Sequence, residues 1–226
     1  MVYSIVINRK IVYNLLTMRK ILSLILIAVM LVSLAACAMP WQKAEEKTDP
    51  KPQIDAAATY TDVNKGDWFE ESVSWGVTEE IMTPAKPTLF GVETPQTRAD
   101  VLLSMWKAAG SPGRQVSAKG VESNDPNSDL SVALAWAVEN KIISKYQASF
   151  TGDDLTRQDV IDYMYTANGS PEMNNVNPAF SDVSVDNSSV SWAKDKSITY
   201  GVGNNLFAPE LACTKAMLIT FLYRAK

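Results

Sequence analysis

The sequence contains no histidine and only two cysteines among its 226 residues. Without histidine it lacks the usual general base of Ser–His–Asp and Cys–His sites and the commonest protein ligand of zinc. Carboxylates remain available for acid–base chemistry, but most lie at expected helix starts or in loops, where a solvated surface explains them. We therefore predict a protein that is not an enzyme and that needs no metal and no cofactor.

A lipoprotein signal peptide is predicted for residues 1–37. Two basic residues precede an apolar run over residues 21–32, and Leu34-Ala35-Ala36-Cys37 then follows the pattern of a lipobox. Cys37 would become the first mature residue and carry acyl chains that hold the protein on a membrane. A retained membrane helix is the alternative, but the run is shorter than the roughly 20 residues that a span needs. Met18 is a candidate for the true start, because residues 1–17 fit neither part of the signal well, and a longer n-region with Arg9 and Lys10 is the alternative.

The second cysteine, Cys213, then has no partner for a disulfide bond. We expect it to be a small, partly buried residue just before the last predicted helix. A catalytic thiol is the alternative interpretation, and the absence of a histidine base argues against it.

The charge balance argues against a nucleic-acid partner. The chain has 21 basic and 25 acidic residues, and the signal peptide contains four of the basic ones and none of the acidic ones. The mature part therefore carries 17 basic and 25 acidic side chains, a net charge of −8. Because such a surface does not attract a polyanion as a whole, binding of an acidic sugar would depend on local arginine side chains inside grooves.

The composition of the mature chain indicates two regions, a linker and a folded domain. Residues 38–59 contain three prolines and alternating charges, which predicts a flexible linker. Residues 60–226 are numerous enough for one domain with a shared core.

Three copies of one pattern fill this domain. Thr-Arg-Ala-Asp starts at residue 97, Thr-Arg-Gln-Asp at residue 156 and Thr-Lys-Ala-Met at residue 214, so the spacing is almost constant. A tryptophan and a phenylalanine precede each threonine at matching distances: Trp75 and Phe90, Trp136 and Phe150, Trp192 and Phe207. Such a period indicates one supersecondary unit used three times. We assign the repeats to residues 60–112, 121–171 and 178–226.

Each threonine is expected to begin a helix. Apolar residues recur four, five, eight and nine positions after it, which is the spacing of one buried helix face. Asp100 and Asp159 complete capping boxes with the first two threonines. Gly110 and Gly169, each followed by Ser-Pro, would stop the first two of these helices.

A second helix is expected around each tryptophan, upstream of the threonine. Asp67 and Glu70 are predicted to cap the first of them, and weaker starts lie near Ser128 and Asn187. Each repeat is therefore predicted to form a helix, a loop and a second helix, and the predicted fold class is all-α.

These ordered motifs resemble the S-layer homology (SLH) module of bacterial surface proteins, whose pattern is F-x-D-V, a helix with tryptophan, G-I-x-x-G, F-x-P and T-R-A-E. Repeat three matches best outside the last motif, with Phe180-Ser181-Asp182-Val183, Trp192, Ile198 to Gly201 and Phe207-Ala208-Pro209. Repeat one shows Tyr60-Thr61-Asp62-Val63, Trp68, Trp75 and Thr97-Arg98-Ala99-Asp100. Repeat two keeps little beyond its tryptophan, phenylalanine and Thr-Arg-Gln-Asp.

The resemblance implies three modules packed as one pseudo-threefold helical unit. The grooves between modules would bind a secondary cell-wall polysaccharide, often one that carries ketal-linked pyruvate, and the protein would lie outside the cytoplasm at the cell surface. The matching positions imply these polysaccharide-binding residues: Arg98, Arg157, Lys215, Asp62, Asp182, Trp68 and Gly201.

The role of the cations has two interpretations. A positive charge at the first helical position opposes the helix dipole by about 0.3–1 kcal/mol, so an arginine there needs another partner. That partner is either a carboxylate of a neighbouring module, such as Asp62 or Asp182, or the pyruvate carboxylate of the polymer. The tryptophans at helical spacing are expected in the core, whereas Trp68 is the expected surface for stacking on a sugar.

Departures from the SLH pattern are expected to weaken ligand binding in individual grooves. Only repeat three has the glycine before the phenylalanine loop, and it replaces the arginine by Lys215, which lacks the planar fork. We therefore hypothesise a lipid-tethered SLH protein that binds the wall polymer non-covalently and links membrane to wall. The alternative is a degenerate SLH scaffold that binds an envelope protein partner instead.

Overall fold

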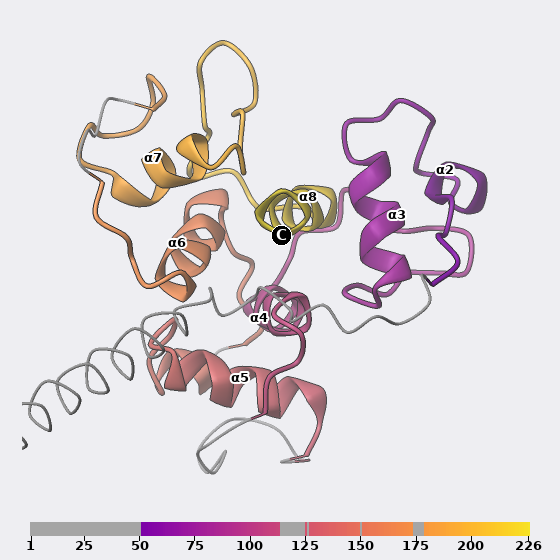
Figure 1. Cartoon of the computed structure of the whole chain (residues 1–226), viewed down its shortest axis with the longest axis horizontal. Coiled ribbons are helices and arrows are strands. Elements are labelled where there is room, and N and C mark those ends of the chain that lie inside the picture. Colours follow the sequence, from indigo (N-terminus) through magenta and orange to yellow (C-terminus); the bar gives the residue numbers. More distant parts are fainter. Residues whose placement is uncertain (1–50, 114–124, 126, 150, 174–178) are drawn as a thin grey trace, which may run out of the picture. The chain divides into compact units, whose positions relative to one another are not determined.

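The computed structural model describes residues 51–113, 125, 127–149, 151–173 and 179–226. The chain divides into two units, Met1–Met39 and Pro40–Lys226, and every described residue belongs to the second. The predicted signal peptide and Cys37 therefore lie outside the described residues. Within the described part there are seven α-helices, one short 3₁₀ helix and no strand, which confirms the all-α class (Figure 1).

The helix after each N-cap threonine forms as predicted. These helices are α4 (Arg98–Ala108), α6 (Arg157–Ala167) and α8 (Lys215–Ala225), and in each the threonine hydroxyl accepts from the third backbone amide. Asp100 and Asp159 complete the capping boxes of α4 and α6, whereas α8 has Met217 at that position. Gly110 and Gly169 follow the ends of α4 and α6 in the left-handed conformation, as expected for helix stops.

The helices that carry the tryptophans are α3 (Glu70–Thr78), α5 (Asp129–Glu139) and α7 (Ser188–Asp195). Ser128 and Asn187 cap α5 and α7 as predicted. The predicted cap of α3 is wrong, because its N-cap is Phe69 and no side chain caps it. The carboxylates of Asp67 and Glu70 instead accept from the amides of Asn64 and Gly66, so they close the preceding turn.

The folded part begins earlier than residue 60, where the predicted linker ends. Helix α2 (Ala56–Thr59) is capped by Asp55 and packs against α3. Ala56 is fully buried, and its amide donates to the hydroxyl of Ser74 at 3.1 Å. The run of alanines is therefore helical, and its first residue, Ala56, belongs to the core. The 3₁₀ helix η1 (Gln147–Ser149) lies in the loop before α6.

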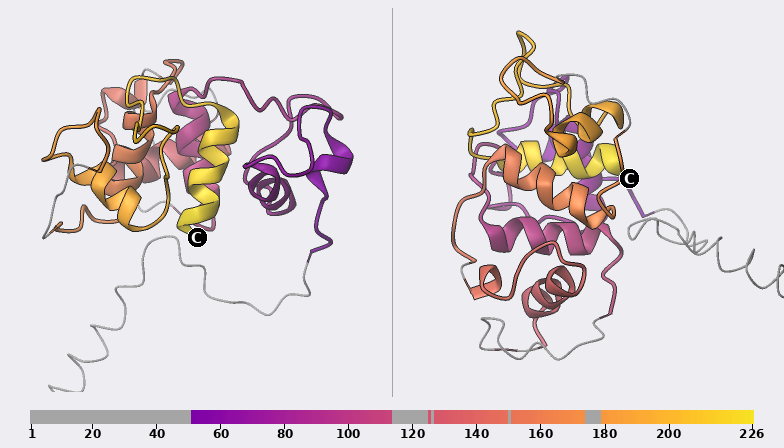
Figure 2. Two further views of the ribbon diagram at one scale, coloured as in Figure 1. Left: turned by 90° about the horizontal axis from the view of Figure 1, so that it is seen from above. Right: turned by 90° about the vertical axis from the view of Figure 1, so that its left-hand side faces the viewer.

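The most extensive helix contacts join neighbouring repeats. Helix α4 packs on α5, α6 packs on α7, and α8 packs on α3 (Figures 1 and 2). The first helix of each repeat therefore lies on the second helix of the preceding repeat, and the last repeat closes onto the first.

A ring of three backbone hydrogen bonds links the loops before α4, α6 and α8. The amide of Gln96 donates to the carbonyl of Cys213, Cys213 donates to Leu155, and Leu155 donates to Gln96, at 2.8–2.9 Å. Each of these residues directly precedes an N-cap threonine. The three repeats are thus equivalent around this ring.

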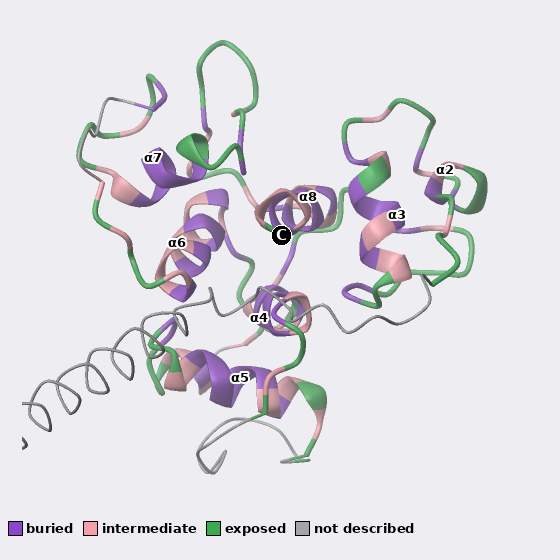
Figure 3. Cartoon of the chain, in the orientation of Figure 1, coloured by how far each residue is buried: buried purple, intermediate pink, exposed green. Residues whose placement is uncertain are grey.

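One hydrophobic cluster includes residues of all three repeats (Figure 3). Phe90 and Phe207 are completely buried. Trp136 and Trp192 are nearly so, as predicted for the tryptophans at helical spacing. Trp75 is half-buried and packs against the ring of Tyr223 in α8, with 5.7 Å between ring centroids. Since a helix pair of this size cannot bury its apolar face alone, the shared core explains why the repeats close on each other.

Candidate functional site

The three cations Arg98, Arg157 and Lys215 occupy equivalent places, each as the first residue of α4, α6 or α8. The backbone amide of each donates to a loop carbonyl of another repeat: Arg98 to Asp153, Arg157 to Leu211 and Lys215 to Thr94, all at 2.9 Å. The next amide of each helix is satisfied in the same way. Differences among the three places therefore come from the side chains.

The side chain of Arg98 is held inside the protein. Its Nε donates to the hydroxyl of Tyr163 in α6, and its Nη1 donates to the carboxylate of Asp153, both at 3.1 Å. Burial acts to lower the pKa of Arg98, but Tyr163 and Asp153 outweigh burial and raise it. The ion-pair partner of Arg98 is thus Asp153 and not Asp62 or Asp182, the two carboxylates expected from the sequence, because backbone amides of their own loops occupy both of these. These contacts give Arg98 the properties of a structural link between repeats one and two.

The ammonium of Lys215 is also occupied. Its Nζ donates to the carbonyls of Thr83 at 2.6 Å and Phe90 at 3.1 Å, and it lies 4.6 Å from the centroid of the Phe90 ring. Burial lowers the pKa of Lys215, partly opposed by the charges of Asp100 and Asp62. Lys215 therefore ties repeat three to the loop of repeat one.

Arg157 has a different environment. Only 3 % of the residue is exposed, and its Nε donates to the carbonyl of Phe207 at 2.8 Å. The guanidinium carbon lies 4.7 Å from the ring centroid of Phe207 and 5.2 Å from that of Phe221. Its Nη2 is buried without a hydrogen-bond partner among the described residues. Burial lowers the pKa of Arg157, and the charge of Asp182 only partly offsets this.

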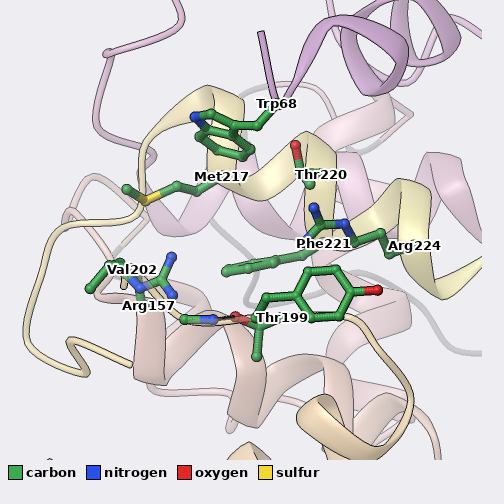
Figure 4. Close-up of a pocket in the computed structure, with 10 residues that line it drawn as sticks. Trp68, Arg157, Thr199, Val202, Met217, Thr220, Phe221 and Arg224 are labelled. Atoms are coloured by element: carbon green, nitrogen blue, oxygen red, sulfur yellow. Dashed lines mark hydrogen bonds between the residues drawn. The ribbon is translucent and has the colours of Figure 1, made fainter. Parts of the chain in front are cut away.

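A pocket of about 450 Å³ reaches Arg157. Figure 4 shows Trp68 and Met217 on one side of it and Arg157 on the other. The lining comes from three repeats: Trp68 from the first, Arg157 from the second, and Thr199 to Val202, Met217, Thr220, Phe221 and Arg224 from the third. Thr220 is buried, and its hydroxyl has no hydrogen-bond partner within the described part of the chain. Two partnerless buried polar groups thus line one pocket.

Aromatic side chains form the open part of this pocket. Trp68 is 56 % exposed and Tyr200 is 68 % exposed. The guanidinium carbon of Arg224 lies 4.7 Å from the ring centroid of Tyr200. Trp68 is thus an exposed aromatic of a pocket, which agrees with its predicted place outside the core.

The equivalent pocket at Lys215 is smaller and carries an acid. It has about 200 Å³, and Asp100 lines it at the position that Met217 occupies in the Arg157 pocket. Its other lining residues are Ile81, Met82, Thr83, Ala85, Thr94, Gln96, Leu103, Ser104, Lys107 and Lys215. The occupied ammonium and the nearby carboxylate make this pocket less suitable for an anion.

Asp62 and Asp182 hold loops. The Asp62 carboxylate accepts from the amides of Phe90, Gly91 and Val92 at 2.7–2.9 Å, and Asp182 accepts from Phe207 and Ala208 at 2.8 Å. Desolvation acts to raise the pKa of both carboxyls, but these amide hydrogen bonds outweigh it and lower the pKa. Both aspartates therefore fix the loops that contain the buried phenylalanines.

Gly201 lines the Arg157 pocket and is needed for the packing of its own loop. Its φ is +79°, and a Cβ there would lie 2.3 Å from the carbonyl oxygen of Leu206 and 2.7 Å from the ring of Phe180. The glycine thus lets Tyr200 and Val202 be placed at the pocket, whatever the ligand.

The described residues contain no group of three or more acidic or cysteine side chains placed to hold a metal ion. None of their helices is long and apolar enough to cross a membrane. Cys213 is buried, and burial raises the pKa of its thiol to about 12.

Sequence reasoning missed Asp153, Tyr163, Thr220 and Phe221. The last three follow their N-cap threonines at helical spacing, so they were visible as helix residues. What could not be seen is that each cation faces the second helix of the following repeat. That relation depends on the closed ring of repeats.

Comparison with known protein families gives one match. The family model of the S-layer homology domain matches residues 59–102 and 179–216, which lie in repeats one and three. No curated protein matches the chain. S-layer homology domains are binding modules of cell-envelope proteins and generally attach to cell-wall polymers. Two segments of the chain, in the first and last parts of the helical ring, thus resemble this family.

Proposed function

We propose that this protein binds an acidic cell-wall polysaccharide non-covalently and that the Arg157 pocket is its binding site. The observation that carries the proposal is the buried Nη2 of Arg157, which lines a pocket and has no partner among the described residues. A buried cation with an unused donor is costly. A carboxylate that enters the pocket would provide the missing hydrogen bond and a counter-charge in direct contact with the guanidinium.

The rest of the pocket suits a sugar. Trp68 and Tyr200 offer exposed aromatic rings to its apolar faces, and the hydroxyl of Thr220 can donate to or accept from a polar group. A sugar with ketal-linked pyruvate combines these requirements, because it carries a carboxylate on a ring of mixed polarity. Since the mature chain is predicted to be acidic overall, the pocket and not the whole surface must supply the attraction.

We also propose that the protein acts in the cell envelope. Repeat two would be a degenerate third SLH module, because its helices α5 and α6 take the places in the ring that correspond to α3 and α4 or to α7 and α8. The lipobox at residues 34–37 supports acylation of Cys37. The protein would then link the membrane to the wall, and it would do so by binding and not by catalysis.

Binding to purified wall sacculi tests the function. The full chain, kept in mild detergent, should sediment with sacculi that retain their secondary polymer and not with sacculi from which the polymer has been removed chemically. Retention on both preparations would contradict the proposal. Binding to an envelope protein instead of sacculi would favour the degenerate scaffold.

Two variants locate the site. Arg157→Gln removes the charge and should weaken binding about ten- to hundredfold, the effect of a lost charge-assisted hydrogen bond. Because Arg157 is buried, its variant needs a melting curve, and Trp68→Ala gives a second test at an exposed position. Tyr146→Ala is the control, since Tyr146 is an aromatic residue of repeat two that is 73 % exposed. Unchanged binding by folded Arg157→Gln and Trp68→Ala proteins would exclude this pocket.

A further inference from the structure

The residue three positions before each N-cap threonine lies at the same place in all three repeats. These residues are Thr94, Asp153 and Leu211. Each carbonyl accepts from the amide of the cation that begins a helix of the preceding repeat, always at 2.9 Å. Because the backbone contacts are the same, the three side chains start from equivalent positions relative to Lys215, Arg98 and Arg157.

In the second repeat this side chain is an acid, and it occupies the arginine. The Asp153 carboxylate lies 3.1 Å from Nη1 of Arg98. Only 12 % of the Arg98 side chain remains exposed. The protein thus supplies its own carboxylate where a bound anion would otherwise be needed.

In the third repeat the equivalent side chain is apolar. Leu211 is 46 % exposed and offers no charge to Arg157. The guanidinium turns instead to the carbonyl of Phe207 and the rings of Phe207 and Phe221, which leaves Nη2 without a hydrogen-bond partner among the described residues. Two arginines in equivalent backbone positions therefore differ in whether an internal carboxylate contacts them directly: Asp153 contacts Arg98, and the structure shows no such contact for Arg157 among the described residues.

We propose that residue 211 determines whether the Arg157 pocket accepts an anion: leucine leaves the guanidinium without a carboxylate in direct contact, whereas an acid there would occupy it as Asp153 occupies Arg98. This inference rests on the proposed function, because it concerns the same pocket. It adds the residue that leaves Arg157 available to the negative charge of the ligand. It also means that, at the equivalent position in repeat one, the protein's own Asp153 carboxylate occupies the guanidinium of Arg98.

Substitution of Leu211 by aspartate and by asparagine tests the inference. The two side chains have the same shape and differ in charge, and the exposed position tolerates both. The probe is a monosaccharide with ketal-linked pyruvate, titrated into the full chain in detergent, with the same sugar without pyruvate as reference. Leu211→Asp should bind the pyruvylated sugar at least about tenfold more weakly than Leu211→Asn. Val185→Asp, which adds the same charge at an exposed place outside the pocket, should bind like the wild type.

A second measurement needs no ligand. If the introduced aspartate of the Leu211→Asp variant pairs with Arg157, its carboxylate is stabilised in the folded state, so the stabilisation is present near neutral pH and is lost as pH falls below about 4. The melting temperature of Leu211→Asp relative to Leu211→Asn should therefore be higher at pH about 7 than at pH about 3.

The outcomes separate the two proposals. Equal affinity of the aspartate and asparagine variants, or a melting-temperature difference that does not change with pH, would overturn the role of residue 211. A wild type that fails to bind the pyruvylated sugar, together with the expected pH effect, would overturn the proposed function and leave the pairing at residue 211 intact.

Discussion

The backbone amide of Cys213 donates a 2.8 Å hydrogen bond to the carbonyl of Leu155, and through Gln96 this bond becomes part of a closed ring. Each repeat contributes one donor and one acceptor to it. The three most extensive helix pairs show the same closure, because each of them combines two different repeats. No repeat is therefore complete by itself.

Removal of repeat three should unfold the remainder. Deletion of residues 178–226 takes α8 away from α3 and α7 away from α6, which exposes the faces that these pairs bury. Chemical denaturation of Pro40–Lys226 followed by circular dichroism should show one transition, and the truncated protein should show no cooperative transition. Two well-separated transitions in the intact unit, or a stable truncated protein, would show that the repeats fold independently.

Arg98→Lys should lower stability without affecting sugar binding. Lysine keeps the charge but cannot reach Tyr163 and Asp153 with two fixed donors. We expect a loss of about 0.5–1.5 kcal/mol in the free energy of unfolding, the net value of one hydrogen bond. Thermal melts and sacculus binding on the same protein measure both effects. Weaker binding with an unchanged melt would instead make Arg98 a ligand residue.

The protein should lose stability in acid through Asp62. Amide hydrogen bonds hold the pKa of its carboxyl below the ordinary 3.8, so its contribution is fully present above that value and is lost as pH falls through the folded-state pKa. Asp62→Asn should therefore destabilise the protein near neutral pH and depend less on pH below about 4. Melting temperatures of the two proteins as a function of pH provide the test. Parallel curves over the acid range would show that the loop does not depend on the ionised carboxylate.

Acylation at Cys37 is expected from the lipobox. Cells that express the protein and receive a fatty-acid analogue should label the wild type and not Cys37→Ser, because serine has no thiol to form the thioether. Cys213→Ser is the matched control, since it removes the other cysteine and should remain labelled. Label on the Cys37→Ser protein would refute this assignment.

Much of the local structure could be predicted from the sequence. The threonines at residues 97, 156 and 214 identify the starts of α4, α6 and α8, because capping and the 3.6-residue apolar period are both local signals. The start of α3 could not be predicted correctly. Asp67 and Glu70 satisfy the same local rule, but the turn at Asn64 and Gly66 competes for their carboxylates.

The site was predictable only in part. The three cations were found from their position in the repeated motif, and Trp68 from its place before a helix. The contacts that each cation makes depend on side chains of the following repeat, such as Asp153 for Arg98 and Phe221 for Arg157. These relations follow from ring closure and appear only once the repeats are packed.

The packing of α3 on α8 also determines when the protein can fold. Helix α3 leaves the ribosome early, and the helix that covers its apolar face is among the last parts of the described chain to be made. Until α8 emerges, α3 has no native partner, and the other two helix pairs lack the neighbour that closes the ring. The ring of helix pairs therefore cannot close before α8 has been made, which is late in the synthesis of the described part of the chain.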